Sequence, residues 1–204
     1  YAAELDRRHG IDISAALLTD VPSATWGLVS TLADSGVRYF AEGCNPTRGP
    51  MAIHSAIREP FYWEGPDGSR LLTWFNRTGY GQSPWLATSR SVDDMDRSLA
   101  PILQAFADSG YPYDEVQLYG AFSDNQPVDP AYDDLVAEWN QRYAYPKIVF
   151  STVAEYFREI EKRHGSEIPV KRGDCGAFWE DGAASSAQAT ALHRDNQQRI
   201  VAAE

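Results

Sequence analysis

Short apolar runs alternate along the chain with longer segments in which apolar residues recur every three or four positions. A short apolar run bounded by turn residues is typical of a buried strand, and the longer pattern is typical of a helix with one face toward a core. Helices are predicted over 22–35, 91–110, 129–143 and 152–165. Strands are predicted over 13–18, 37–40, 115–120 and 147–151. This alternation predicts an α/β fold with right-handed βαβ units and a parallel sheet, either open or closed into a barrel.

Residues at the helix ends support this assignment. Ser91 precedes two acidic residues and is a predicted N-cap, because its hydroxyl can accept a hydrogen bond from the first turn. Thr152 and Glu155 have the spacing of a capping box. Gly36 and Gly110 follow the last apolar residues of their helices, where glycine commonly ends a helix.

Two segments interrupt the alternation. Residues 61–75 hold two strand-like runs joined by Gly-Pro-Asp-Gly, a sequence that predicts a β-hairpin. After Arg172 the chain becomes small, polar and rich in turn residues, and then continues as a last helical segment. We therefore expect a domain boundary near 165–175, with an α/β domain over 1–168 and the start of a second, helical domain over 169–204.

Charge and composition narrow the function classes. The chain has 204 residues, of which 18 are Lys or Arg and 29 are Asp or Glu, which gives a net charge of -11. This acidic balance disfavours a nucleic-acid partner, which needs a basic face. No apolar run has membrane-spanning length and no signal-peptide pattern is present. The compartment stays undecided, because the two cysteines fit either free thiols or a disulfide. Cys44 and Cys175 lie far apart in sequence and are read as buried thiols, with one disulfide as the alternative.

Two carboxylates follow predicted strands. Asp20 comes just after the strand at 13–18, and Asp124 comes just after the strand at 115–120. In parallel α/β folds, ligands bind at the carboxyl ends of the strands, so both side chains are expected on one edge of the sheet. Such a pair suits cleavage of a glycosidic bond, in which one carboxylate attacks the anomeric carbon and the other protonates the leaving oxygen. Trp63 and Tyr80 are candidate stacking faces for sugar rings.

Each of these residues also has a purely structural interpretation. An Asp before a proline at a helix start is a common N-cap, which applies to Asp20. Asp124 is followed by Asn125 and Pro127 and also fits a turn. Trp63 lies in the predicted hairpin, where a large aromatic residue commonly packs into the core.

Several stretches resemble glycoside hydrolase family 38, the α-mannosidases. Residues 7–40 are similar to the family segment in which a strand ends at the catalytic Asp, and residues 60–74 resemble its F-x-W-x-G-x-D-G-S-x-(V/L)-L stretch. Residues 118–130 resemble the loop that bears the acid/base Asp, and residues 148–161 resemble the F-S-T-x-x-E-Y-F sequence after it. Residues 178–204 are similar to the entry into the helical bundle. The stretches occur in the family's order over nearly the whole chain.

The resemblance implies the later part of a seven-stranded parallel (β/α) barrel, followed by the start of an α-helical bundle. Asp20 matches the residue that acts as nucleophile and zinc ligand, and Asp124 matches the acid/base. The family has a zinc-binding His near the start of the bundle, where this chain has Glu180 and Asp181. Carboxylate oxygens are competent zinc ligands, so both residues are candidate ligands for zinc or another divalent metal.

The function expected from the resemblance is retaining, metal-assisted hydrolysis of α-mannosides or related glycosides. The alternatives are a non-catalytic carbohydrate-binding relative and a barrel deacetylase that acts on carbohydrate. The family's upstream His-x-Asp pair is absent from the sequence, and both ends have helical character. We therefore expect the chain to be a piece of a longer protein and to be inactive alone. The expected partner is a carbohydrate substrate, with no nucleic acid and no membrane.

Overall fold

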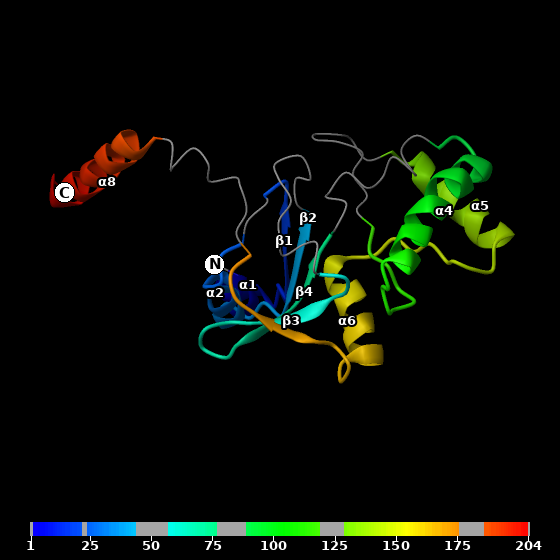
Figure 1. The fold of residues 1–204 in the computed structure, drawn as a ribbon, viewed down its shortest axis with the longest axis horizontal. Helices are drawn as coiled ribbons and strands as arrows, with labels where there is room; N and C mark the ends of the chain where they lie inside the picture. Colours follow the sequence, from blue (N-terminus) through cyan, green and yellow to red (C-terminus); the bar gives the residue numbers. More distant parts are fainter. Residues whose placement is uncertain are drawn as a thin grey trace.

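A computed structural model describes residues 2–21, 24–43, 57–76, 89–118, 129–175 and 186–203. Its helices are α1 (Ala2–His9), α2 (Leu28–Asp34), α4 (Val92–Asp108), α5 (Ala131–Arg142), α6 (Val153–His164) and α8 (Ala187–Ala203). Its strands are β1 (Ala15–Thr19), β2 (Tyr39–Gly43), β3 (Phe61–Glu64), β4 (Arg70–Phe75) and β5 (Val170–Arg172). The fold is therefore α/β, as predicted (Figure 1).

One five-stranded sheet has the order β1-β2-β4-β3-β5. Strands β1, β2 and β4 run parallel, which confirms the first βαβ unit. The predicted hairpin is also confirmed, because β3 pairs with β4 in the antiparallel direction. Strand β5 joins the far side of β3 and runs parallel to it. The sheet is thus mixed rather than wholly parallel, and its closure into a barrel remains a prediction.

Aromatic side chains fill the core beside this sheet. The ring centroids of Phe40 and Trp63 lie 6.2 Å apart, and Phe75 lies 6.1 Å from each of them. All three side chains are at most 1% exposed. Residues from β2, β3 and β4 therefore share one apolar cluster, which holds the hairpin to the parallel strands.

Helix α6 packs on β1 and β2. Its N-terminus has the predicted capping box, in which Thr152 and Glu155 exchange hydrogen bonds between side chain and backbone. The ring of Tyr39 stacks on Phe157 of this helix, with centroids 5.6 Å apart. The phenols of Tyr39 and Tyr62 each donate to one oxygen of Glu161, at 2.9 Å. These contacts join α6 to two strands of the sheet.

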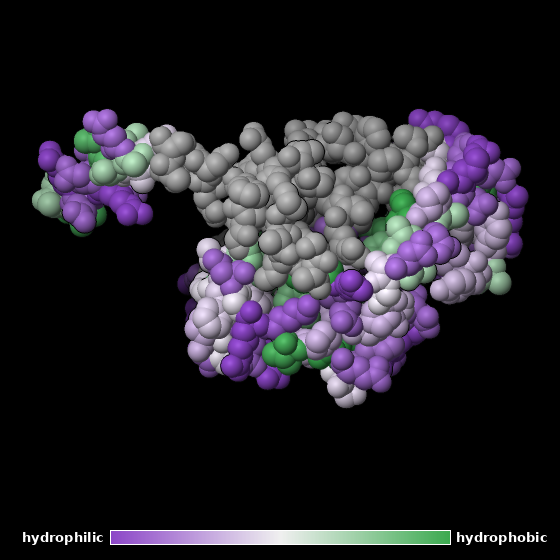
Figure 2. All heavy atoms as spheres, viewed as in Figure 1, coloured by the Kyte–Doolittle hydropathy of each residue, from purple (hydrophilic) through white to green (hydrophobic). Residues whose placement is uncertain are grey.

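Helices α4 and α5 contact each other and share a second apolar cluster that includes Met95, Leu99 and Trp139. Helix α4 begins as predicted, since the Ser91 hydroxyl accepts a hydrogen bond from the N–H of Asp94. Hydrophilic residues predominate on the visible surface of this helix pair (Figure 2).

Two predicted strands are wrong within the described part of the chain. Residues 147–151 form no strand. The side-chain amide of Asn140 donates to the carbonyl oxygen of Ile148, at 2.7 Å, and accepts from its backbone N–H, at 3.0 Å. Val149 and Phe150 are accordingly 74% and 55% exposed. Residues 115–118 also form no strand.

The predicted last helix is present as α8, and none of its described side chains is buried. No helix among the described ranges has both the length and the apolar character needed to cross a membrane. The position of a domain boundary remains a prediction, although β5 lies beyond residue 168 and still pairs with β3.

Candidate active site

Asp20 lies where strand β1 ends. Its backbone φ is 64°, the one positive value at a described residue other than glycine. Few side chains adopt this left-handed conformation without strain, and Asp and Asn do so more readily than most. The N–H of Asp20 donates to the carbonyl oxygen of Gly43, at 2.9 Å. The residue is therefore fixed by the neighbouring strand and turns the chain out of the sheet, with its side chain half-buried.

The parallel strands end together at this edge. Thr19 pairs with Gly43, and Glu42 pairs with Phe75. The N–H of Asn76 continues the ladder by donating to the carbonyl oxygen of Glu42, at 2.8 Å. Asp20 consequently lies at the shared carboxyl end of β1, β2 and β4, the position where α/β folds place their ligands.

A buried carboxylate near this edge was missed by sequence reasoning. Glu42 is 0% exposed and lies one residue before the end of β2. It pairs with Leu18 and Phe75, and the alternation of side chains along β2 puts it on the same face as Phe40. Burying a carboxylate is costly unless it is compensated. The signal in the sequence was a Glu directly after Tyr39, Phe40 and Ala41, two positions beyond the predicted strand.

Cys175 brings a distant part of the chain beside the segment that follows Asp20. Its backbone exchanges two hydrogen bonds with Ala24, at 3.2 and 3.1 Å, and the Asp174 carboxylate accepts from the N–H of Trp26. Burial, and then the charges of Glu42 and Asp174, together raise the pKa of the Cys175 thiol to about 12. The thiol is therefore protonated at neutral pH.

Trp63 lies inside the core rather than at the edge of the sheet. Its side chain is 1% exposed, and its indole N–H donates to the carbonyl oxygen of Gly173, at 2.9 Å. This is the position expected of a packing residue, the alternative interpretation given above. A stacking role for Trp63 would require the ring to be uncovered.

The other predicted site residues lie outside the described residues: Tyr80, Asp124, Glu180 and Asp181. The separation of Asp20 from Asp124 is thus untested, and the pair remains a prediction. In the described ranges, no three His, Cys, Asp or Glu side chains are grouped closely enough to hold a metal ion. Of the predicted zinc ligands, Asp20 alone is described, and its half-buried carboxylate has the right chemistry for one.

Comparison with known families and structures gives two findings. Residues 6–175 match the model of the glycosyl hydrolases family 38 N-terminal domain. The fold is similar to the crystal structure of an alpha-mannosidase from Enterococcus faecalis V583, with a TM-score of 0.63 and 12% sequence identity. That similarity covers 83% of this chain but 19% of the mannosidase chain, and at this identity it shows the fold alone. No curated protein matches the sequence.

Proposed function

Because the chain belongs to glycoside hydrolase family 38, we propose that it supplies part of the catalytic domain of a retaining α-mannosidase. The observation that carries this proposal is the place of Asp20. Its carboxylate stands at the common carboxyl edge of three parallel strands, on a backbone held in a left-handed conformation. An unusual backbone conformation at a ligand-binding edge is typical of residues that take part in chemistry.

In the proposed reaction, Asp20 is the nucleophile and Asp124 is the acid/base. The Asp20 carboxylate attacks the anomeric carbon while the bond to the leaving oxygen breaks, and Asp124 gives its proton to that oxygen. The product of this step is a glycosyl ester of Asp20. A water molecule, deprotonated by Asp124, then attacks the anomeric carbon and releases Asp20. Two displacements at the same carbon retain its configuration.

Asp20 is also a proposed ligand of zinc, together with Glu180 or Asp181. Zinc held by these carboxylates would act as a Lewis acid that binds sugar hydroxyls and helps to hold the ring in a distorted, reactive shape. The backbone of Cys175 is hydrogen-bonded to Ala24, which follows Asp20 by four residues. The two candidate ligands come shortly after Cys175 in the sequence. This proximity supports a metal site formed by Asp20 and by the segment that follows Cys175. Tyr80 is proposed to stack on the substrate ring.

The test replaces Asp20 by Asn and by Ala in the full-length protein and measures turnover of aryl α-mannosides. Loss of a nucleophile is expected to lower kcat by about a thousandfold or more, since catalytic groups of this kind supply several kcal/mol of the rate enhancement. Asp12→Asn is the matched control, because this exposed carboxylate lies on the amino side of β1. Turnover of the Asp20 variants within a few-fold of the wild type would refute the assignment.

Further measurements distinguish the proposed retaining hydrolase from an inverting enzyme, a non-catalytic relative and a deacetylase. NMR of the first-formed product distinguishes retention from inversion at the anomeric carbon, and the proposal requires retention. Sugar binding without turnover would identify a non-catalytic relative, and release of acetate would identify a deacetylase. The zinc content of purified protein is expected to fall in Asp20→Ala and to stay unchanged in Asp12→Asn.

A further inference from the structure

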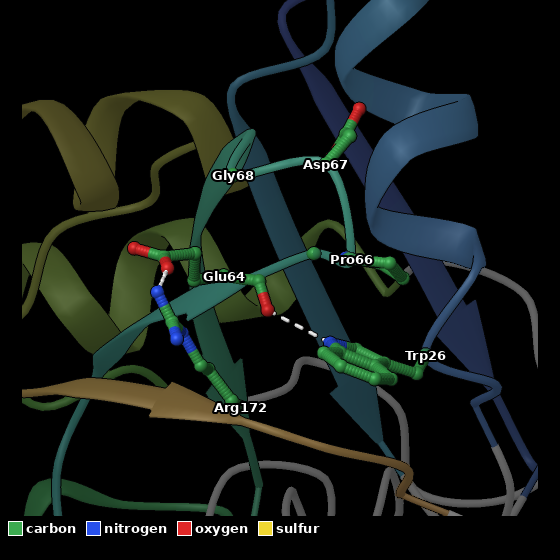
Figure 3. A pocket seen from close by; sticks show the side chains of 7 residues that line it. Trp26, Glu64, Pro66, Asp67, Gly68 and Arg172 are labelled. Carbon is green, nitrogen blue, oxygen red and sulfur yellow. Dashed lines mark hydrogen bonds and ion pairs between the residues drawn. The ribbon is translucent and has the colours of Figure 1, made fainter.

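A second region with binding chemistry lies at the opposite edge of the sheet. A pocket of about 280 Å³ is lined by Trp26, by the hairpin residues 64–68 and by Arg172 (Figure 3). Glu64 pairs with Arg70, the first residue of β4, whereas Asp20 follows the last residue of β1. Since β1 and β4 run in the same direction within the sheet, the pocket and Asp20 belong to opposite edges.

The aromatic wall of the pocket is held in place from two sides. The indole N–H of Trp26 donates to the carbonyl oxygen of Glu64, at 2.8 Å, and its backbone N–H donates to Asp174, at 3.0 Å. Pro66 lines the same pocket on the hairpin (Figure 3). The Trp26 ring is only half-buried. Part of the ring packs against the main apolar cluster, and the remainder gives the pocket an apolar wall at a fixed position.

The polar wall is formed by a charged group spanning three strands. The Glu64 side chain is 4% exposed and pairs with Arg70 on β4 and with Arg172 on β5. Glu64 holds one end of the Arg172 guanidinium, whose side chain remains 70% exposed. Arginine carries five N–H donors, so several stay available to a ligand in the pocket.

The tip of the hairpin is rigid. The N–H of Gly68, at a φ of 86°, donates to the carbonyl oxygen of Gly65, as in a tight turn that ends in a left-handed glycine. The Asp67 carboxylate accepts from the Ser69 hydroxyl and N–H, at 2.6 and 3.1 Å. Hydrogen bonds from Ser69 and then Ser30 lower the pKa of Asp67 to about 2, so this carboxylate is charged at neutral pH.

The side chains that line the pocket carry more negative than positive charge. Glu64 and Asp67 contribute two negative charges and Arg172 contributes one positive charge, and Asp174 accepts from the backbone N–H of Trp26 nearby. Arg70 pairs with Glu64 but does not line the pocket. A phosphate or carboxylate ligand would meet these acids, so the charge of the lining disfavours an anion. A flat apolar ring beside guanidinium donors and carboxylate acceptors instead suits a neutral ring with many hydroxyl groups. The volume is near the lower end of the range for small-molecule sites.

We propose that this pocket is a second carbohydrate-binding site, which holds one sugar residue between Trp26 and Arg172 and is separate from the edge that carries Asp20. The sugar ring stacks on the indole, and its hydroxyl groups accept from Arg172 and donate to carboxylate or carbonyl oxygens of the hairpin. The choice of a mannoside as first ligand rests on the proposed function. The pocket itself does not depend on catalysis.

The test follows the indole N–H signals of the full chain by two-dimensional ¹H–¹⁵N NMR. The sequence has six Trp residues, and Trp26→Phe identifies the Trp26 signal as the one that disappears. Titration with methyl α-mannoside is expected to shift this signal in a saturable way. Arg172→Gln is expected to weaken that binding at least about tenfold, which corresponds to ~1.4 kcal/mol. Glu64 keeps Arg70 as a partner in this variant, so the fold is expected to be retained.

Three controls decide the outcome. Arg142→Gln removes a comparable exposed ion pair, with Asp93, and should leave the titration unchanged. Arg172→Lys keeps the charge but loses the planar fork, and an intermediate affinity is expected. Asp20→Asn should leave the Trp26 shift intact, so failure of the hydrolase proposal would not remove this result.

A Trp26 signal that stays unmoved by the mannoside, or that moves equally in Arg172→Gln, overturns the proposal. A signal that responds to inorganic phosphate and not to the mannoside also overturns it, in favour of an anion site.

Discussion

The backbone N–H of Asp20 is hydrogen-bonded to the carbonyl oxygen of Gly43, at 2.9 Å. This bond is the last link between β1 and β2, and it forms although Asp20 has left the extended conformation of the strand. The neighbouring strand therefore fixes the residue at which the chain turns and positions its carboxylate at the edge of the sheet.

The left-handed backbone at Asp20 predicts an unequal response to substitution. Asp20→Gly should fold with wild-type stability or slightly better, because glycine adopts a φ of 64° freely, but it should lose activity with the carboxylate. Asp20→Val should cost about 1–2 kcal/mol, since a β-branched residue is strained there. Urea denaturation measures both variants. Equal stability of the Gly and Val variants would show that the conformation imposes no strain.

Glu64 is predicted to hold three strands together. Glu64→Ala leaves Arg70 and Arg172 without their shared carboxylate and should lower the free energy of unfolding by about 2 kcal/mol. Arg172→Gln should cost less, because Arg70 still pairs with Glu64 and Arg172 is largely exposed. Denaturant midpoints of the variants provide the measurement, with Glu138→Ala on the exposed side of α5 as the control. If Glu64→Ala lowers the free energy of unfolding no more than the control does, Glu64 does not hold the three strands together.

Tyr62 is predicted to make stability depend on pH in the alkaline range. Burial, followed by its hydrogen bond to Glu161, raises the pKa of Tyr62 from 10.0 to about 12. The phenol therefore contributes to stability fully below pH 10.0, and this contribution is lost as the pH rises toward about 12. In Glu161→Gln the pKa of Tyr62 should move toward 10.0, because the carboxylate no longer opposes ionisation of the phenol.

Ultraviolet titration of tyrosinate absorbance measures this change, and subtraction of the Tyr62→Phe curve isolates the step of Tyr62. Glu159→Gln is the matched control, since this acid lies on the same helix and pairs with Arg163 and Lys162. An unchanged Tyr62 step in Glu161→Gln, or an equal shift in Glu159→Gln, would show that Glu161 does not perturb the phenol.

The capping box at the start of α6 should be measurable as well. Thr152→Ala removes the acceptor for the N–H of Glu155, at 3.2 Å, and should cost about 1 kcal/mol. Thr152→Ser keeps the hydroxyl and should restore most of that stability. Thermal unfolding followed by circular dichroism compares the pair. A serine variant as unstable as the alanine variant would indicate that the methyl group, rather than the cap, is responsible.

Local features of the fold were predictable from the sequence, and long-range ones were not. The caps at Ser91 and Thr152 depend on residues three positions away, so their pattern is visible in the sequence. The expected strand at 147–151 failed because Asn140, a residue of the preceding helix, takes the backbone groups of Ile148. Apolar character alone did not reveal that Val149 and Phe150 would be exposed.

The candidate site shows the same limit. Asp20 was found because an acid at the end of an apolar run is unusual, and the structure places it at the predicted edge of the sheet. Glu42 was missed because its burial depends on β1 and β4, which lie on either side of β2. The burial of Trp63 depends on Phe40 and Phe75, which are also distant in sequence. Contacts of this kind cannot be read from the spacing of residues along one strand.

Identification of the residue that becomes glycosylated tests the central claim most directly. The full-length protein is incubated with an activated fluorinated mannoside, whose ester with a nucleophilic carboxylate hydrolyses slowly, and its peptides are analysed by mass spectrometry. We predict one added sugar residue on the peptide that contains Asp20, and no labelling in Asp20→Asn. A label on another carboxylate, or labelling that persists in Asp20→Asn, would contradict the assignment of Asp20 as the nucleophile.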